Sequence, residues 1–318
     1  MKNFCLRGLA AALVIFICAG TVGAVTLVPG GQVIGLQLED DTLTVAGFHE
    51  QLGGAARAAG METGDRLVAV DGVSVKSAAD VHKALQNAGD KVSISVMRSG
   101  KTKRLRVTPV RTEQGCKLGV YLRQGTTGLG TVTFYDPHTD KYGALGHGVN
   151  STDGSLLQLH SGSVYEASVF SVKKGAVGKP GQLLGQLTQK DGIGTVEKNT
   201  AQGVFGHLEQ GICDEPLPVG DAQVGSAMIR STVGSFGPRE YSVEILKIYP
   251  NGTDRTRNML LKVTDKELLA TTGGIVQGMS GSPLVQDGKL IGAVTHVLVN
   301  DPTMGYGIFI ENMLEAAG

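Results

Sequence analysis

The hydrophobic pattern of the chain consists mostly of short apolar runs rich in valine and isoleucine, separated by turns that contain glycine. Runs of this length, bounded by turn-forming residues, predict β-strands. Beyond residue 115 the clearest expected strands are residues 130–135, 141–145, 224–233 and 241–249, and a helical pattern returns only at 312–317. Many short strands at this spacing favour a sandwich or a barrel.

Composition narrows the possible partners. The 318 residues are 41% hydrophobic and 18% charged, which is enough to bury the cores of a medium and a small domain. Lysine plus arginine equals aspartate plus glutamate, at 29 each. Because no net positive field is available to hold a polyanion, nucleic acid is not expected as a partner.

The N-terminal segment predicts export. Lys2 and Arg7 precede an uncharged stretch, residues 8–28, and no further charge occurs before Glu39. This pattern is typical of a secretory signal, but 21 apolar residues are also long enough to span a bilayer. We therefore expect residues 1–28 to be either a cleaved signal peptide or a retained membrane anchor.

Residues 29–112 are expected to form a small domain with short strands and two helical segments, 53–60 and 77–88. Its centre is AGMETGDRLVAVDGVSV at 59–75, where a helix ends at Gly60 and Asp71-Gly72 reverses the chain between two strands. The glycines and apolar positions of this stretch resemble the PDZ signature, which implies a peptide-binding domain.

In PDZ domains a peptide adds as a strand beside a helix, and a glycine-containing loop captures its terminal carboxylate. The resemblance assigns that loop to Val45, Ala46, Gly47 and Phe48, and the groove-lining helix residues to Val81 and Leu85. A free C-terminus and an internal strand both remain possible ligands.

The strongest chemical motif is GGIVQGMSGSP at residues 273–283, followed by two apolar strands joined at Asp287-Gly288. A serine in such a turn resembles the nucleophile of chymotrypsin-like proteases. Ser280 would be the nucleophile, and the N–H groups of Gly278 and Ser280 would form the oxyanion hole. The resemblance implies a mainly β chain, with a PDZ domain followed by a chymotrypsin-like double β-barrel at residues 113–318.

A serine needs a base within hydrogen-bond reach. His147, in KYGALGHGV at 141–149, resembles the histidine turn of the same proteases. Substrate would pair with Thr295, His296 and Val297, and Gly305 and Gly307 would leave room for its side chain. The order histidine, acid, serine leaves six aspartates open as the third group: Asp153, Asp191, Asp214, Asp221, Asp254 and Asp265.

These motifs together resemble the SpoIVB-type sporulation serine peptidases. The likeness includes VPGG at 28–31, TVTFY at 131–135, the histidine and serine motifs, and VNDPT at 299–303. It implies a triad of His147, Asp265 and Ser280. Asp265 lies only 15 residues before the serine, which is later than the acid of typical chymotrypsin-like enzymes. It either orients the imidazole or is a structural cap for the following residues, 267–269.

The resemblance also implies an activity. We expect an exported endopeptidase of the forespore intermembrane space that cleaves itself and a membrane-bound regulator, leading to activation of a late mother-cell sigma factor. Neither a metal nor another cofactor is needed for this chemistry. Two alternatives are a catalytically dead binding protein that acts through its PDZ groove, and an envelope quality-control protease of broad specificity.

Overall fold

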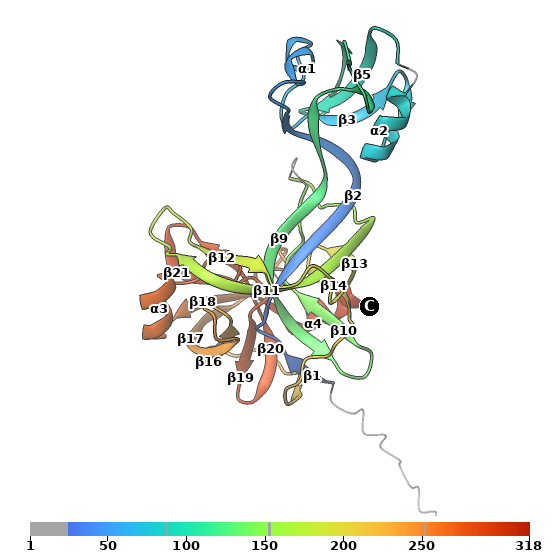
Figure 1. Cartoon of the computed structure of the whole chain (residues 1–318). Coiled ribbons are helices and arrows are strands. Elements are labelled where there is room, and N and C mark those ends of the chain that lie inside the picture. Colours follow the sequence, from blue (N-terminus) through green and yellow to red (C-terminus); the bar gives the residue numbers. More distant parts are fainter. Residues whose placement is uncertain (1–24, 87, 152–153, 251) are drawn as a thin grey trace, which may run out of the picture.

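The computed structural model describes residues 25–86, 88–151, 154–250 and 252–318, so most of the predicted leader lies outside it. Residues 26–28, which the prediction assigned to the leader, belong to a strand. A small unit stands apart from a larger body and is joined to it by two long strands (Figure 1). No helix in the described residues is both long and apolar enough to cross a membrane.

The first part of the larger body is a closed ring of six antiparallel strands. Its order is β2 (Val33–Phe48), β9 (Val120–Asp136), β10 (Lys141–Ala144), β14 (Gly203–Leu208), β13 (Gly194–Thr200) and β11 (Ser161–Lys173), and β2 closes the ring because it pairs with both β11 and β9. Three further strands pair outside this ring: β1 (Thr26–Pro29) with β9, β12 (Gln182–Leu187) with β11, and β15 (Leu217–Pro218) with β1. Alternating residues such as Ile34, Leu36 and Leu38 fill the interior.

The second part is another six-stranded barrel. It contains β16 (Gly225–Ser231), β17 (Arg239–Ile248), β18 (Met259–Val263), β21 (Asp301–Phe309), β20 (Lys289–Leu298) and β19 (Pro283–Gln286). Helix α4 (Ile310–Ala317) buries Ile310 and Met313 in a cluster with residues of both barrels. The expected mainly β class with two barrels is confirmed.

A short helix that the sequence pattern did not predict, α3 (Lys266–Thr272), precedes the serine motif. Seven residues are too few to show a helical period. Its ends nevertheless have local signals, because Asp265 is the N-cap and Gly273 adopts a left-handed conformation, φ +77°, at the C-terminus.

The small unit contains two helices and short strands around a separate core. Its elements are α1 (Gly54–Ala58), β3 (Arg66–Val70), β4 (Val73–Ser74), α2 (Ala78–Leu85), β5 (Val92–Arg98), β6 (Lys101–Val107), β7 (Val110–Thr112) and β8 (Gly115–Lys117). Ser77 begins α2 with a capping box that includes Asp80. The two predicted helical segments both form, in shorter versions.

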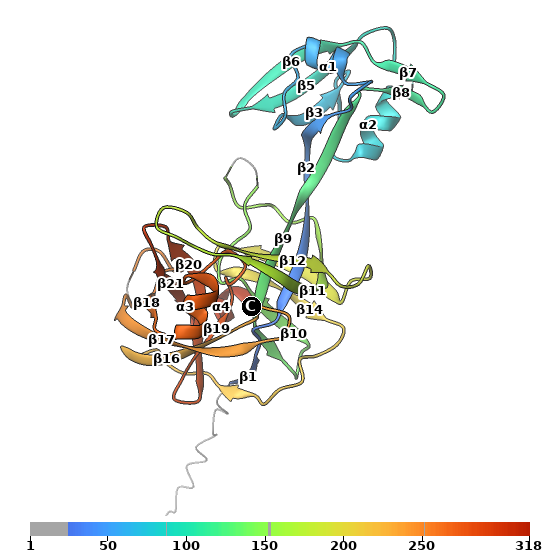
Figure 2. The same cartoon turned by 60° about the vertical axis from the view of Figure 1, so that its left-hand side comes forward.

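The structure divides the chain differently from the predicted boundaries of 1–28, 29–112 and 113–318. Strand β1 and the first half of β2 belong to the first barrel, whereas residues 43–48 of β2 and 120–124 of β9 belong to the small unit. The small unit is therefore inserted into a strand pair of the first barrel, as the turned view also shows (Figure 2). Linear boundaries fail because β2 and β9 each serve two units.

Candidate active site

Ser280 lies in the turn between α3 and β19, in the second barrel. The N–H of Met279 donates to the carbonyl of Val276 at 3.1 Å, and Gly278 has φ +99°, as in a type II turn. Only glycine adopts this conformation without strain, which explains the Gly-x-Ser pattern. The N–H of Gly281 donates to Val294 in β20 at 2.8 Å and so ties the turn to its own barrel.

Two buried threonines of β9 hold the same turn from the first barrel. The Thr131 hydroxyl donates to the Gly278 carbonyl at 2.7 Å, and the Thr133 hydroxyl donates to the Gly281 carbonyl at 2.8 Å. The Thr131 N–H donates to the Ser280 carbonyl at 3.1 Å. A Cβ on Gly281 would come within 2.1 Å of the Thr131 carbonyl oxygen, so this contact between the barrels requires glycine.

Residues 131–135 belong to the stretch that carries the family resemblance, but their sequence does not show these hydrogen bonds. The signal was present: Thr131 and Thr133 alternate with apolar residues in a strand, and both are completely buried. Buried hydroxyls need partners. Their partners come from a turn almost 150 residues later, which local patterns do not reveal.

His147 follows β10 after two residues with left-handed backbones, Leu145 at φ +69° and Gly146 at φ +68°. A buried leucine in that conformation is a strained position of the kind that clusters at functional sites. The His147 Nδ1 atom lies 2.9 Å from the Gly148 carbonyl oxygen. Because a carbonyl only accepts, we assign the proton of neutral His147 to Nδ1, which leaves Nε2 as the basic nitrogen.

Burial lowers the pKa of His147 below its ordinary value of 6.5, against the hydrogen bond to Gly148, which raises it. Burial disfavours the charged imidazolium. The imidazole is therefore neutral near pH 7, the state in which it can accept a proton.

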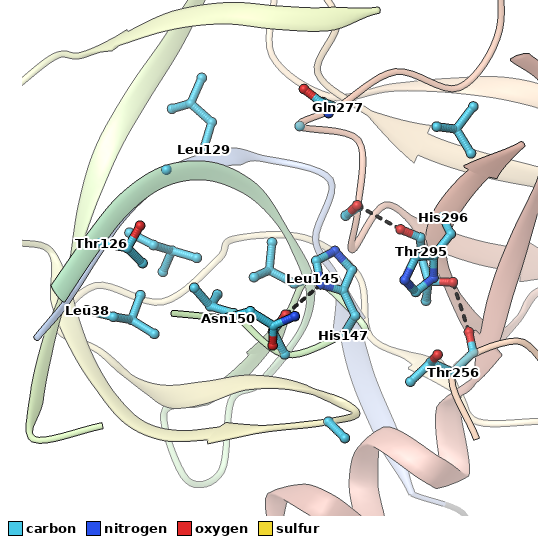
Figure 3. A pocket seen from close by; sticks show the side chains of 18 of the residues that line it. Leu38, Thr126, Leu129, Leu145, His147, Asn150, Thr256, Gln277, Thr295 and His296 are labelled. Carbon is cyan, nitrogen blue, oxygen red and sulfur yellow. Dashed lines mark hydrogen bonds between the residues drawn. The ribbon is translucent and has the colours of Figure 1, made fainter. Parts of the chain in front are cut away.

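Ser280 and His147 line one cavity of about 800 Å³, which we call the active-site cavity. Thr126, Gly128, Leu129, Gly278, Thr295, His296 and Val297 also line it. The Ser280 hydroxyl donates to the Thr295 carbonyl at 2.9 Å. Figure 3 shows Thr295 beside His296, with His147 facing them. The serine is thus not bonded to His147 in this state, and apo sites often tighten only with substrate.

Two backbone N–H groups of the serine turn are available to a ligand. Within the part of the chain that the structure describes, neither Gly278 nor Ser280 donates its N–H to any acceptor. Both belong to residues that line the active-site cavity. This is the pair of donors that the sequence predicted for an oxyanion hole, and its function remains a prediction.

His296 lies beside His147, with ring centroids 5.2 Å apart. Burial, followed by His147 and Arg257, lowers the pKa of His296 to about 4, and Asp254 opposes this shift. Its Nδ1 atom is buried without a hydrogen-bond partner among the described residues. Together with Thr295 and Val297 it lines the active-site cavity, where the prediction placed a substrate-binding strand.

Gly305 and Gly307 do not line the active-site cavity, which corrects the expectation that they leave room for substrate. They lie in β21 opposite Val297 and Val294. A Cβ on Gly305 would meet the His296 carbonyl oxygen at 2.5 Å, and one on Gly307 would meet Leu284 and Leu261 near 3 Å. The space beside both glycines is occupied by the barrel itself.

Asp265 also lies outside the active-site cavity. Its carboxylate accepts the N–H of Leu268 at 2.8 Å and that of Ser242 at 3.4 Å, so it caps α3. This geometry corresponds to the cap, not to the triad acid, and it corrects the triad expectation. Of the other candidate aspartates, Asp153 is outside the described residues and Asp254 lines the cavity. The effect of Asp254 falls on His296 and not on His147.

The peptide groove of the small unit has a different edge from the predicted one. Val81 and Leu85 line a pocket with Ala78 and His82 of α2, and its opposite wall is formed by residues 116–122. Val45, Ala46, Gly47 and Phe48 do not line it. They lie in the neighbouring strand β2, which pairs with β9, and Gly47 is the partner of Tyr121. At this edge of the pocket the residues that line it are Leu118, Gly119 and Val120, which include a glycine.

Comparison with known proteins gives matches to both parts of the chain. The family model for SpoIVB peptidase S55 matches residues 114–314, and a PDZ domain model matches residues 50–98. A curated protein of Brucella suis named "Putative zinc metalloprotease" is 38% identical over 82 residues, which is 26% of this chain. The match spans only 22% of that relative's length.

Among solved structures, the inactive form of the Rv3671c protease is 14% identical, with a TM-score of 0.36 over 59% of this chain and 82% of that one. The active form, from M. tuberculosis, is 15% identical, with a TM-score of 0.36 over 61% and 75%. Such scores are too low to support an argument. The family model covers well over half of the chain: this protein belongs to the SpoIVB peptidase S55 family of serine peptidases and contains a PDZ domain.

Proposed function

We propose that Ser280 and His147 carry out the peptidase reaction, with Asp265 in a purely structural position. The observation that carries this proposal is the convergence of both side chains on one cavity, beside two backbone N–H groups that have no acceptor in the described structure. Each barrel supplies one of the two reacting groups.

In the first step, the Ser280 hydroxyl leaves its bond to the Thr295 carbonyl and turns toward His147. Its Oγ attacks the carbonyl carbon of the substrate while Nε2 of His147 takes the proton. The carbonyl oxygen becomes negative and accepts the N–H groups of Gly278 and Ser280. Because these donors belong to a turn held by Thr131, little reorganisation is required.

In the second step, the tetrahedral intermediate expels the amine. The C–N bond breaks, and the proton passes from Nε2 to the leaving nitrogen. A water molecule then attacks the acyl-enzyme, again with His147 as the base, and releases the new carboxylate and Ser280. Throughout the cycle the Gly148 carbonyl accepts the Nδ1–H and performs the orienting role that a carboxylate has in other serine proteases.

Labelling with a fluorophosphonate tests this assignment. We expect a single adduct on Ser280, located by mass spectrometry after digestion, and no adduct on the Ser280→Ala protein. Failure of the wild-type protein to react would favour the alternative of a catalytically dead shell that binds through its PDZ groove.

We further propose that the substrate is a membrane-bound regulatory protein of a sporulation pathway that activates a late mother-cell sigma factor, and that the peptidase is exported and cleaves itself. Family membership supports this biological context, and the charge and apolar pattern of residues 1–28 supports export. The N-terminal segment would bring enzyme and substrate to the same membrane.

Two measurements test this context. The mass of the mature protein, which reports where its N-terminus lies, should differ between the wild type and Ser280→Ala when both are expressed in a spore-forming host, because self-cleavage requires the serine.

The second measurement compares two substrates. A membrane-anchored regulator should be cut at one position, while unfolded casein should be degraded far more slowly. Equal degradation of both would favour an envelope quality-control protease.

A further inference from the structure

One strand, β9, forms both the wall of the PDZ groove and the wall of the active-site cavity. Strand β2 pairs with β9 along one edge, from Val120 opposite Phe48 to Thr131 opposite Val33. Among the described residues no strand pairs with the other edge between residues 120 and 129. This unpaired edge of β9 therefore passes from the PDZ domain to the peptidase barrel (Figure 1), with one irregularity at Gly125, where φ is +70° and the pairing with β2 shifts register between Leu38 and Leu43.

At its barrel end, the unpaired edge faces the active-site cavity. The N–H and carbonyl of Thr131 point away from β2, because they bond with Ser280 and Leu145. Backbone direction alternates along a strand, so the N–H and carbonyl groups of Leu129 and Thr127 point to the same side. Both residues line the cavity that contains Ser280. Figure 3 shows Leu129 and Thr126 across the cavity from His147 and His296.

At its other end, the same edge faces helix α2. Val120, Tyr121 and Leu122 line the PDZ groove opposite Val81 and Leu85. Gly119 precedes them with φ +69°, and a Cβ there would lie 2.2 Å from the Leu52 carbonyl oxygen, so this tight glycine-containing loop has no room for a side chain at residue 119. Such loops capture the carboxylate at the end of a peptide, which fixes a ligand's C-terminus near Val120.

A ligand that is held in this way has a defined direction. With its C-terminus at the beginning of β9, its preceding residues run antiparallel to β9, toward Leu129 and Ser280. The part of the substrate that lies C-terminal to the scissile bond would occupy this path, because it connects that bond with the substrate's C-terminus.

Resting on the serine peptidase function proposed above, we infer that β9 acts as a ruler: this enzyme cleaves polypeptides at a fixed distance before a free C-terminus. Eleven residues separate Val120 in the groove from Thr131 beside the nucleophile. At about 3.3 Å per residue this is roughly 36 Å, which an extended partner of about ten to twelve residues spans. The preferred substrate class is a chain with an extended, accessible C-terminal tail.

Cleavage of random 20-residue peptides tests this distance preference. The peptide library is prepared once with free C-terminal carboxyl groups and once as C-terminal amides. Cleavage positions are mapped by mass spectrometry with the wild-type enzyme. We expect cuts in the free-acid library to concentrate ten to twelve residues before the C-terminus, and we expect this preference to fall at least tenfold in the amide library.

Two matched variants connect the preference to the groove. Ala78 and Ala79 are adjacent exposed residues of α2, and only Ala78 lines the groove. Ala78→Trp should obstruct the groove and remove the positional preference, whereas Ala79→Trp should keep it. Neither substitution alters a buried residue, so both proteins should fold.

The possible outcomes separate this inference from the function beneath it. The same cut distribution in acid and amide libraries, or loss of the preference in both variants, would overturn the ruler and leave the peptidase intact. Absence of cuts in a protein whose Ser280 reacts with a fluorophosphonate would also contradict the ruler, since 20-residue acids satisfy its requirement. Absence of both cuts and labelling would refute the proposed function itself.

Discussion

The two barrels differ in how they present their reacting groups. The second barrel is built from consecutive strands between residues 225 and 309 and places Ser280 in a turn that is bonded to both barrels. The first barrel is interrupted by the PDZ domain and presents His147 after a strained leucine. Among the described residues the His147 ring makes one hydrogen bond, to Gly148. The nucleophile is therefore fixed by many contacts, and the base by few.

This difference indicates which group adjusts when a substrate binds. The backbone of the serine turn is held by Thr131, Thr133 and β20, so only the Ser280 hydroxyl has to rotate. The imidazole of His147 packs near that of His296 and has no carboxylate partner within the described residues. We expect substitutions around the serine turn to alter turnover, and those around His147 to alter the pH dependence.

The largest effects are expected from removing either reacting group. Ser280→Ala and His147→Ala should each lower kcat/KM by about 10⁴-fold or more, and the double variant should be no worse than either, because the two groups act as a unit. Thermal unfolding should remain close to that of the wild type. Appreciable activity of His147→Ala would show that the first barrel does not supply the base.

A smaller effect is expected when the contact between the barrels is weakened. Thr131→Val removes the hydrogen bond to the Gly278 carbonyl, so the oxyanion donors lose their fixed position and kcat should fall about 10- to 100-fold with little change in KM. Steady-state kinetics on a mapped peptide measures both constants.

Thr232→Val is the matched control for this substitution. Thr232 is a buried threonine whose hydroxyl donates to the Gly31 carbonyl at 2.8 Å, away from the active-site cavity. Thr131→Val leaves the part-buried Gly278 carbonyl without this partner, and Thr232→Val does the same to the buried Gly31 carbonyl. Loss of a buried partner costs about 1–3 kcal/mol of stability, so the control bounds the destabilisation expected from Thr131→Val. If kcat falls equally in both, the effect of Thr131→Val comes from stability and not from the turn.

Two substitutions of Asp265 distinguish a structural role of this residue from a catalytic one. Asparagine caps helices as well as aspartate does, so Asp265→Asn should retain both stability and kcat/KM, whereas Asp265→Ala should lose about 0.5–2 kcal/mol of stability. Chemical denaturation and peptide kinetics provide the two readouts. A loss of activity near 10⁴-fold in a stable Asp265→Asn protein would restore the triad acid.

The smallest effect is a displacement of the pH profile. Burial lowers the pKa of His147 below 6.5, so its neutral form persists to lower pH than in an exposed histidine. We expect kcat/KM to be constant near pH 7 and to reach half its maximum at a pH below 6.5 as the imidazole becomes protonated. A midpoint above 7 would mean that a negative charge stabilises the imidazolium when substrate is absent.

Several features of the site could be predicted from the sequence because they depend on neighbouring residues. The turn around Ser280 needs glycine at 278 and 281, and the chain has glycine at both positions. The short apolar runs predicted strands and favoured a sandwich or a barrel, and the resemblance of the serine motif supplied the double β-barrel. The histidine turn was identified by its small residues.

Other features could not be predicted because they depend on distant segments. Asp265 has the correct chemistry for a triad acid, but only the position of α3 shows that its carboxylate is used by Leu268 and Ser242. The resemblance to PDZ domains places the carboxylate loop at residues 45–48, which contain one glycine. The pairing of β2 with β9 places residues 118–120 next to α2 instead.

By itself, the sequence determined the class of chemistry, the two turns that carry it and the presence of a peptide-binding domain, since each is a property of a short contiguous segment. Only the tertiary structure decided that this domain is inserted into a strand pair of the first barrel, that Thr131 joins the two barrels at the serine, and that one strand edge connects groove and cavity. Strand pairing depends on contacts between segments far apart in the chain, and a linear pattern does not specify which strands will meet.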